Sequence, residues 1–178
     1  MEVTKLKIIG SWSDVLDAAK VTINKDQSEF FPTLDWRRRM LIAEHSPLRM
    51  LSVTWTWVDI PYWVAVHFRT HKVGVEHFIC SQRTDRTGLD REALSQNALV
   101  KHKVIANVQA ILNMARKRMC INASKETREA FFLFLEALQN VDSEIANACL
   151  PECEYRSGWC PEFRGCGRYP GVFSRRCK

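Results

Sequence analysis

The sequence predicts an α+β fold in which a β-sheet packs against long helices within one domain. Residues 51–58, Leu-Ser-Val-Thr-Trp-Thr-Trp-Val, alternate β-branched or aromatic residues with small polar ones, which is typical of a strand. Apolar residues at helical spacing predict long helices over residues 97–119 and 126–138. A chain of 178 residues has room for one hydrophobic core and not for two ordinary domains. Because the strands are scattered among helices, we predict the α+β class.

Shorter predicted elements each begin or end at a residue with a known boundary preference. They are a strand over 4–9 ended by Gly10, a helix capped by Ser13 that runs through Ala19, a helix over 36–45 capped by Asp35 and stopped by Pro47, and a helix begun by Pro61 that runs through His67. The segment 69–86 is polar and is predicted to be irregular.

The composition is that of a folded protein rather than a disordered one, with 46% hydrophobic and 26% charged residues. No apolar run approaches the roughly 18 residues that a membrane helix needs. The opening residues 1–5 do not begin a signal peptide. We therefore expect a cytoplasmic protein with no membrane partner.

The basic excess favours an anionic partner. The chain has 26 Lys and Arg against 20 acidic residues, which gives a formal net charge of +6. This balance does not separate nucleic acid from small molecules that carry phosphate. The basic clusters at 37–39, 116–118 and 175–176 lie in separate contexts, and each is equally compatible with a solvated helix face.

Seven cysteines crowd toward the C-terminus. The segment 151–178 is rich in Pro, Gly, Cys and Arg, so we predict a loop-built appendage to a domain over 1–150. Without a secretory signal, these thiols indicate either reduced structural cysteines or metal ligands. A zinc ion or an iron–sulfur cluster would use the four that stand closest together, which are Cys149, Cys153, Cys160 and Cys166.

Two short motifs in the polar segment suggest a phosphate site. Thr70-His71-Lys72 precedes Ser81-Gln82-Arg83 by about ten residues, after a predicted buried helix. Hydroxyl and backbone N–H groups can bind phosphate oxygens while a guanidinium group neutralises their charge. A polar loop of this kind is also common as plain solvated surface.

Three ordered elements together resemble the flavin-dependent thymidylate synthases. That family has Arg-His-Arg, seven or eight residues, Ser, and then Arg two positions on; here eight residues separate Lys72 from Ser81, and Arg83 follows. Upstream, the family's His-Ser/Thr-Pro element and Thr-aromatic strand resemble residues 45–47 and 53–55. Downstream, its Asn-x-Arg, Asn, Arg and Ala-x-x-Glu series resembles residues 107–109, Asn113, Arg118 and 123–126.

The resemblance implies roles for particular residues. Arg118 and Ser81 take the catalytic positions, with Arg118 reading the base, although no His-Asp pair is visible that would make Ser81 a nucleophile. The substrate-binding residues would be Ser81, Gln82, Arg83, Arg91 and Arg118. The cofactor-binding residues would be His45, Ser46, Arg69, His71, Lys72, Asn107, Gln109 and Asn113.

The activity implied is the reductive methylation of dUMP to dTMP by a homotetramer that binds FAD. Methylenetetrahydrofolate would supply the carbon, and NADPH would reduce the flavin. The chain departs from the family at Thr70, Lys72 and Gln109, where the family has arginine, while Arg69 lies one place early. Thr84 stands where an aromatic residue is usual, and Arg49 where an acidic one is expected.

Two other functions remain open at this point. The altered triplet is compatible with an enzyme that makes another methylated or hydroxymethylated pyrimidine nucleotide. A basic nucleic-acid-binding module with a metal-bound tail is the alternative from another class, and it would stack bases on Trp55, Trp57 and Trp159. The alternation of Trp55 and Trp57 is explained more simply as one face of a strand, so a small nucleotide is the favoured ligand.

Overall fold

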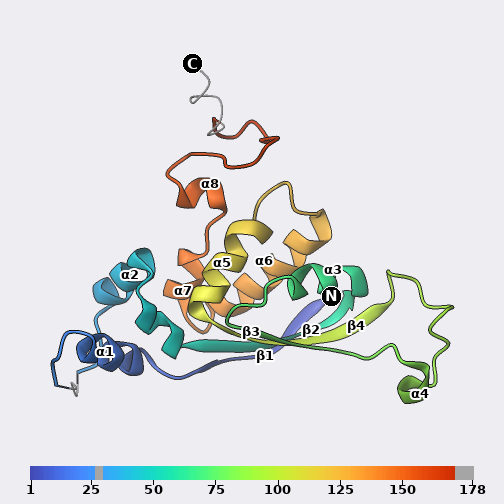
Figure 1. The fold of residues 1–178 in the computed structure, drawn as a ribbon, viewed down its shortest axis with the longest axis horizontal. Helices are drawn as coiled ribbons and strands as arrows, with labels where there is room; N and C mark the ends of the chain where they lie inside the picture. Colours follow the sequence, from blue (N-terminus) through green and yellow to red (C-terminus); the bar gives the residue numbers. More distant parts are fainter. Residues whose placement is uncertain (27–29, 171–178) are drawn as a thin grey trace.

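A four-stranded antiparallel sheet lies under a layer of helices in the computed structural model, which describes residues 1–26 and 30–170. The strand order is β1-β2-β4-β3. The strands are β1 (Glu2–Ile9), β2 (Ser52–Pro61), β3 (Val75–Ile79) and β4 (Leu99–Asn107). Figure 1 shows α3, α5, α6 and α7 on one side of the sheet, with α8 beyond α5. The α+β architecture predicted from the sequence is confirmed.

The helices vary from one turn to four. They are α1 (Trp12–Val21), α2 (Leu34–Ala43), the 3₁₀ helix η1 (Ser46–Met50), α3 (Tyr62–Arg69), α4 (Thr84–Thr87), α5 (Val108–Arg118), α6 (Lys125–Gln139), α7 (Ser143–Ala148) and α8 (Glu152–Tyr155). In the described part of the chain, no helix has the length and apolar character needed to cross a membrane.

The predicted strand over 51–58 is confirmed as β2, in the middle of the sheet. Its alternation directs Trp55 and Trp57 into the core, where both are fully buried and meet edge to face at 5.2 Å. Trp57 also stacks on Phe68 of α3 at 4.4 Å and donates a hydrogen bond to the Ala130 carbonyl in α6. Strand and helical layers are therefore joined through one pair of indoles, which have no exposed ring face for stacking a base.

The long helix predicted over 97–119 is wrong in its first half, which is strand β4. Every second residue of that half is buried, namely Val100, His102, Val104 and Ala106. Period-two burial fits a strand, and hydrogen bonds to both β2 and β3 stabilise it from either side. Asn107 ends the strand and caps α5, because its Oδ1 accepts a hydrogen bond from the Ala110 N–H at 2.9 Å.

Other boundaries also differ from the sequence-based expectation. The segment 69–86 contains β3, a short edge strand that pairs with β4. Helix α1 is capped by Ser11 and not by Ser13, since Ser11 and Asp14 form a reciprocal capping box. Helix α2 is capped by Thr33 and not by Asp35. In both helices the chosen cap is two residues earlier, where the backbone is still extended.

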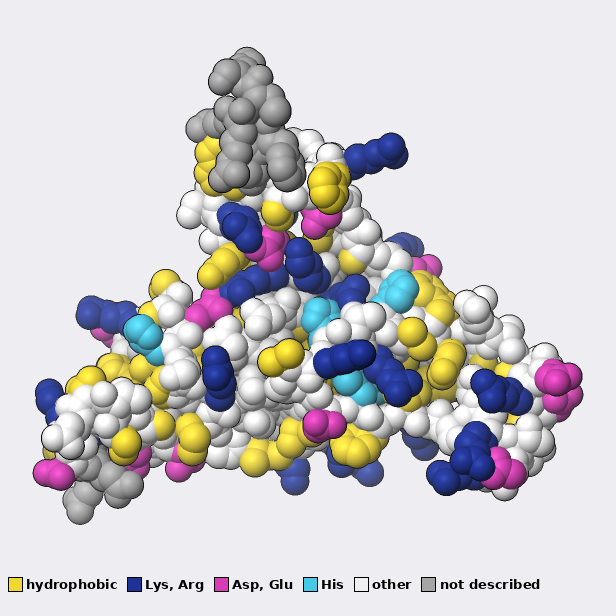
Figure 2. All heavy atoms as spheres, viewed as in Figure 1, with side chains coloured by type: hydrophobic (Ala, Val, Ile, Leu, Met, Phe, Trp, Pro, Cys, Tyr) yellow, Lys and Arg dark blue, Asp and Glu magenta, His cyan; other side chains and the backbone are white. Residues whose placement is uncertain are grey.

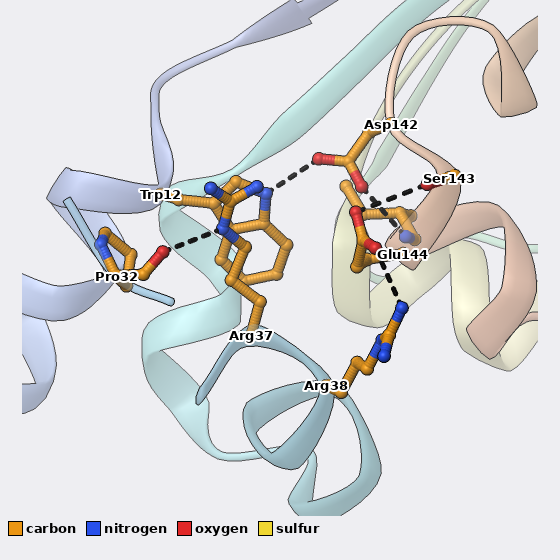
Figure 3. Close-up of polar contacts among 8 residues, drawn as sticks. Trp12, Pro32, Arg37, Arg38, Asp142, Ser143 and Glu144 are labelled. Carbon is orange, nitrogen blue, oxygen red and sulfur yellow. Dashed lines mark hydrogen bonds and ion pairs between the residues drawn. The ribbon is translucent and has the colours of Figure 1, made fainter. Parts of the chain in front are cut away.

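Polar contacts join helices α1 and α2 to the start of α7 (Figure 3). Trp12 donates from Nε1 to Asp142 Oδ2 at 2.7 Å, and Asp142 Oδ1 caps α7 by accepting from the Ile145 N–H at 3.0 Å. Arg38 of α2 pairs with Glu144 at 3.5 Å. One buried carboxylate thus satisfies both an indole and a helix start, which fixes α1 and α7 relative to each other.

Candidate functional site

Arg118, the last residue of α5, is bound to the turn that follows α3. Its Nε donates to His71 Nε2 at 2.9 Å, and its Nη2 donates to the His67 carbonyl at 2.7 Å and to Thr70 Oγ1 at 2.8 Å. A guanidinium group at the C-terminus of a helix satisfies free carbonyls and complements the helix dipole. The sequence-predicted residues Arg118 and His71 are therefore in direct contact.

The protonation of His71 follows from this contact. Burial, followed by the neighbouring Arg118 charge and His77, lowers the pKa of His71 to about 4. The imidazole is neutral at pH 7. The lone pair on its Nε2 accepts the hydrogen bond from Arg118 Nε. Three of the five N–H groups of Arg118 are used, while Nη1 makes no hydrogen bond within the described residues. That edge is available to a carbonyl or an anion.

A polar pocket of about 240 Å³ lies beside this turn. The predicted phosphate-binding residues converge there. Its lining is Tyr62, Arg69, Ile79, Cys80, Ser81, Gln82, Arg83 and Arg91. Arg69, which lines the pocket, precedes Thr70, which Arg118 contacts. Figure 2 shows Lys, Arg and His side chains gathered toward the middle of the face of the molecule that is in view.

The pocket forms because β3 ends at Ile79 and the chain then turns into the short helix α4. Ser81 Oγ accepts a hydrogen bond from the Arg83 N–H at 3.2 Å, which shapes the turn. Arg83 makes a two-pronged contact with Asp85, at 2.9 and 2.6 Å, and both side chains are more than half exposed. Arg83 therefore brings a partly neutralised charge, and Arg69 and Arg91 supply the pocket's remaining positive charge.

Gln109 and Asn113 lie on the opposite face of α5. Nine positions separate Gln109 from Arg118, which is half a turn out of alignment at about 100° per residue. Gln109 donates to Glu44 Oε2 at 2.5 Å, Arg116 pairs with Glu44 Oε1, and Arg116 also donates to Asn113 Oδ1 at 2.8 Å. We call Glu44, Gln109, Asn113 and Arg116 the Glu44 cluster. The predicted cofactor residues His45 and Ser46 follow Glu44 directly.

The Glu44 cluster borders a cavity of about 390 Å³. Glu44 ends α2 in the left-handed region, with φ 51°, which turns its carboxylate toward α5. The Arg116 guanidinium carbon lies 3.6 Å from the centre of the Tyr155 ring of α8. The amide of Gln109 and the charge of Arg116 are thus already occupied by partners in the same chain.

Asn107 belongs neither to the Arg118 contacts nor to the Glu44 cluster. Its backbone closes the turn that carries His71 and Lys72. Its N–H donates to the Gly74 carbonyl at 2.9 Å. Gly74 has φ +72°, and a Cβ at that position would lie 2.4 Å from Asn107 Nδ2. Glycine is required here both by the backbone conformation and by the close approach of the amide. Lys72 is exposed.

The four-cysteine metal site expected from the sequence does not form. Across residues 1–26 and 30–170, no group of three or more His, Cys, Asp or Glu is placed to hold a metal ion. Cys149 is buried in the core, where its thiol donates to the Ile145 carbonyl at 3.4 Å, and burial raises its pKa to about 12. Cys153, Cys160 and Cys166 instead line a cavity of about 410 Å³ together with Cys120.

Four residues that make long-range polar contacts near the candidate site were not expected from the sequence as site residues: Glu44, His77, His102 and Arg116. The alternation in β4 was the available signal for His102, since it places that side chain on the buried face beside Val100 and Val104. Glu44 stands next to the His-Ser-Pro element, but nothing local indicates that it binds a residue 65 positions away.

The chain has the fold of the flavin-dependent thymidylate synthases. A structure of ThyX of this class from Helicobacter pylori, complexed with FAD and dUMP, has a TM-score of 0.70 at 11% identity, covering 84% of this chain and 100% of that one. A second structure of the same protein with FAD and dUMP has a TM-score of 0.68 at 10% identity, covering 84% and 97%.

The UMP/dUMP methylase PolB from Streptomyces cacaoi, bound with 5-Br dUMP, is similar as well. Its TM-score is 0.63 at 12% identity, covering 83% of this chain and 94% of that one. No protein-family model matches the sequence, and no curated protein sequence matches it. The similarity is one of fold.

Proposed function

We propose that the protein is an FAD-dependent enzyme that methylates dUMP to dTMP with methylenetetrahydrofolate and NADPH. The observation that carries this proposal is that Arg118 keeps a free Nη1 edge while Ser81, Arg69 and Arg91 line one pocket, with Arg69 next in sequence to the Thr70 that Arg118 contacts. A guanidinium edge suits the pyrimidine carbonyls, and the pocket suits the 5′-phosphate. The fold that the chain shares with dUMP-bound and FAD-bound structures supports the same assignment.

In this proposal the chain's own residues bind and polarise the pyrimidine. Arg118 donates from Nη1 toward the pyrimidine carbonyl side and stabilises negative charge that develops there. Neutral His71 orients Arg118 without adding a second charge. Ser81, Gln82, Arg83 and Arg91 hold the phosphate. A bound reduced flavin supplies the hydride.

The residues fit the charged part of FAD better than its ring. Arg69 and Lys72 are cations near the same turn and suit a diphosphate. The amide of Gln109 is held by Glu44, and Asn113 by Arg116, so both need a rearrangement before they can bind an isoalloxazine ring. Because Gln109 and Arg118 face opposite ways, one chain cannot offer both to one ligand. In a homotetramer whose site combines residues of several chains, one ligand would contact Gln109 of one chain and Arg118 of another.

Flavin binding tests the proposal directly. FAD added to stripped protein in the presence of dUMP should show fluorescence quenching that saturates in the micromolar range. The double substitution His71→Ala, Asn107→Ala should abolish the quenching, while Asn140→Ala, at the exposed end of α6, should leave it unchanged. Thermal melting must show that the double variant is folded, because Asn107 caps α5. No binding up to millimolar FAD would exclude FAD as the cofactor.

A second candidate keeps the site and changes the product. The similarity of fold to the UMP/dUMP methylase PolB favours a related enzyme that makes another modified pyrimidine nucleotide. Mass spectrometry of the product formed from dUMP and from UMP separates the two candidates. Nucleic-acid binding through Trp55 and Trp57 has no support, because both indoles are fully buried.

A further inference from the structure

Two histidines behind the candidate site continue the contacts of Arg118 into the sheet. His77 on β3 lies 2.8 Å from the His71 carbonyl through Nε2, and 3.0 Å from His102 Nε2 through Nδ1. His102 on β4 is fully buried, and its ring lies 5.4 Å from the Trp57 ring. An unbroken series of polar contacts thus runs from the core of the sheet through His77 and His71 to Arg118.

The direction of each hydrogen bond follows from the partners. A carbonyl only accepts, so His77 Nε2 carries a proton and donates to the His71 carbonyl. With its single ring proton on Nε2, His77 has a lone pair on Nδ1, which accepts from the N–H at His102 Nε2. His102 Nδ1 is left as a bare lone pair, consistent with its lack of a hydrogen-bond partner in the described residues.

Burial keeps His102 uncharged at pH 7. Burial first, and then the neighbouring His77, together lower the pKa of His102 to about 3. A buried imidazole with one unsatisfied nitrogen has a cost relative to an apolar residue. A phenylalanine or leucine at position 102 would fill the same space beside Trp57 without that cost, so fold stability alone does not explain the histidine.

We propose that His77 and His102 are positioning residues that hold the turn 70–72 so that His71 receives Arg118 with its Nη1 edge free. The His71 carbonyl is fixed by His77, and the His71 ring fixes Arg118 Nε. His102 sets the tautomer of His77 by donating to Nδ1. The proposal rests on the proposed function only in taking Arg118 as the group that reads the ligand.

The first experiment needs no ligand. Nitrogen NMR of the full chain should show protons on Nε2 of His77 and His102 and on Nδ1 of His71. In His77→Phe, which removes both contacts and keeps a ring, the Arg118 Nε–H signal should shift toward that of a free guanidinium. In His77→Gln, whose amide nitrogen reaches the position of Nε2, the signal should stay near the wild-type value. An unchanged Arg118 signal in folded His77→Phe overturns the proposal.

The second experiment measures dUMP binding by calorimetry. We expect His77→Phe to weaken dUMP about tenfold and His77→Gln to restore most of the loss. Turnover of the FAD-loaded enzyme should fall through KM more than through kcat. If wild type binds dUMP and His77→Phe binds it with equal affinity, the proposal is also overturned. If wild type binds no dUMP while the Arg118 signal shifts as expected, the proposed function fails and the positioning role stands.

Discussion

The two faces of helix α5 carry polar clusters of different character. At its C-terminal end, the hydrogen-bond partners of Arg118 among the described residues are neutral groups: the His71 ring, the Thr70 hydroxyl and the His67 carbonyl. On the other face, Arg116 is paired with Glu44, and both side chains are about 15% exposed or less. One arginine keeps its charge and one free edge, while the other is neutralised within the chain.

The difference shows which half of the candidate site is ready to bind. A guanidinium held by neutral acceptors still attracts an anion or a carbonyl, whereas a paired one must first lose its carboxylate. The half proposed to bind the nucleotide, with Arg118 and the Ser81 pocket, therefore needs no carboxylate partner to be displaced from Arg118. The half proposed to bind the flavin, with Gln109 and Asn113, is occupied by contacts inside the chain.

Removing Arg118 should have the largest effect. Arg118→Ala should abolish turnover and weaken dUMP binding by about 1.5–3 kcal/mol, the range for a charge-assisted hydrogen bond. Arg116→Ala on the other face serves as the control and should leave dUMP affinity within about twofold. Calorimetry on folded variants measures both. Unchanged dUMP affinity in Arg118→Ala would remove that residue from the site.

Loss of the ligand's phosphate should have the next largest effect. Deoxyuridine should bind at least about tenfold more weakly than dUMP, because Arg69, Arg83 and Arg91 line the pocket assigned to the phosphate. The difference should shrink as added salt screens these charges. Titrations of both ligands at low and high salt measure it. Equal affinities for nucleoside and nucleotide would contradict the phosphate assignment.

Opening the Glu44 cluster should strengthen flavin binding. Glu44→Gln keeps the shape and one acceptor but removes the charge, so unfolding free energy should fall by about 1 kcal/mol. FAD should bind more tightly, because the Gln109 amide is then held by an uncharged acceptor and is released more easily to the isoalloxazine ring. Asp35→Asn breaks an exposed pair with Arg39 and should change neither quantity. Weaker FAD binding in a folded Glu44→Gln protein would mean that Glu44 itself supports the cofactor.

The smallest expected effect is on stability in mild acid. The pKa of His71 is lowered to about 4 in the folded chain, so the unfolded chain takes up its proton first as pH falls. The contribution of neutral His71 to the free energy of unfolding is intact above pH 6.5 and is lost as the pH falls from 6.5 to about 4. After allowance for solvent contact, the loss amounts to about 0.5–1 kcal/mol. Denaturation curves of wild type minus His71→Gln should show this slope, and a flat difference would contradict it.

The sequence by itself determined the elements with a strong local period and the residues joined by short loops. The alternation at 51–58 predicted β2, and the apolar spacing after residue 125 predicted α6. Ser81, Gln82, Arg83 and Arg91 were expected to act together, and the chain between them is short enough for one pocket to contain them all. The motif spacing also indicated the fold that the similar structures share.

The tertiary structure decided whatever depends on partners far away in the sequence. Residues 99–107 are a strand because β2 and β3 hydrogen-bond to both of their edges, which no local pattern encodes. Glu44 closes the Gln109 face across 65 positions, and His102 and His77 reach Arg118 only once the sheet has formed. Cys149 is buried in the core, where its thiol donates to the Ile145 carbonyl of α7, and it does not line the cavity that Cys153, Cys160 and Cys166 share. Local sequence sets backbone preference, but the free energy of a buried polar contact depends on the groups that folding brings beside it.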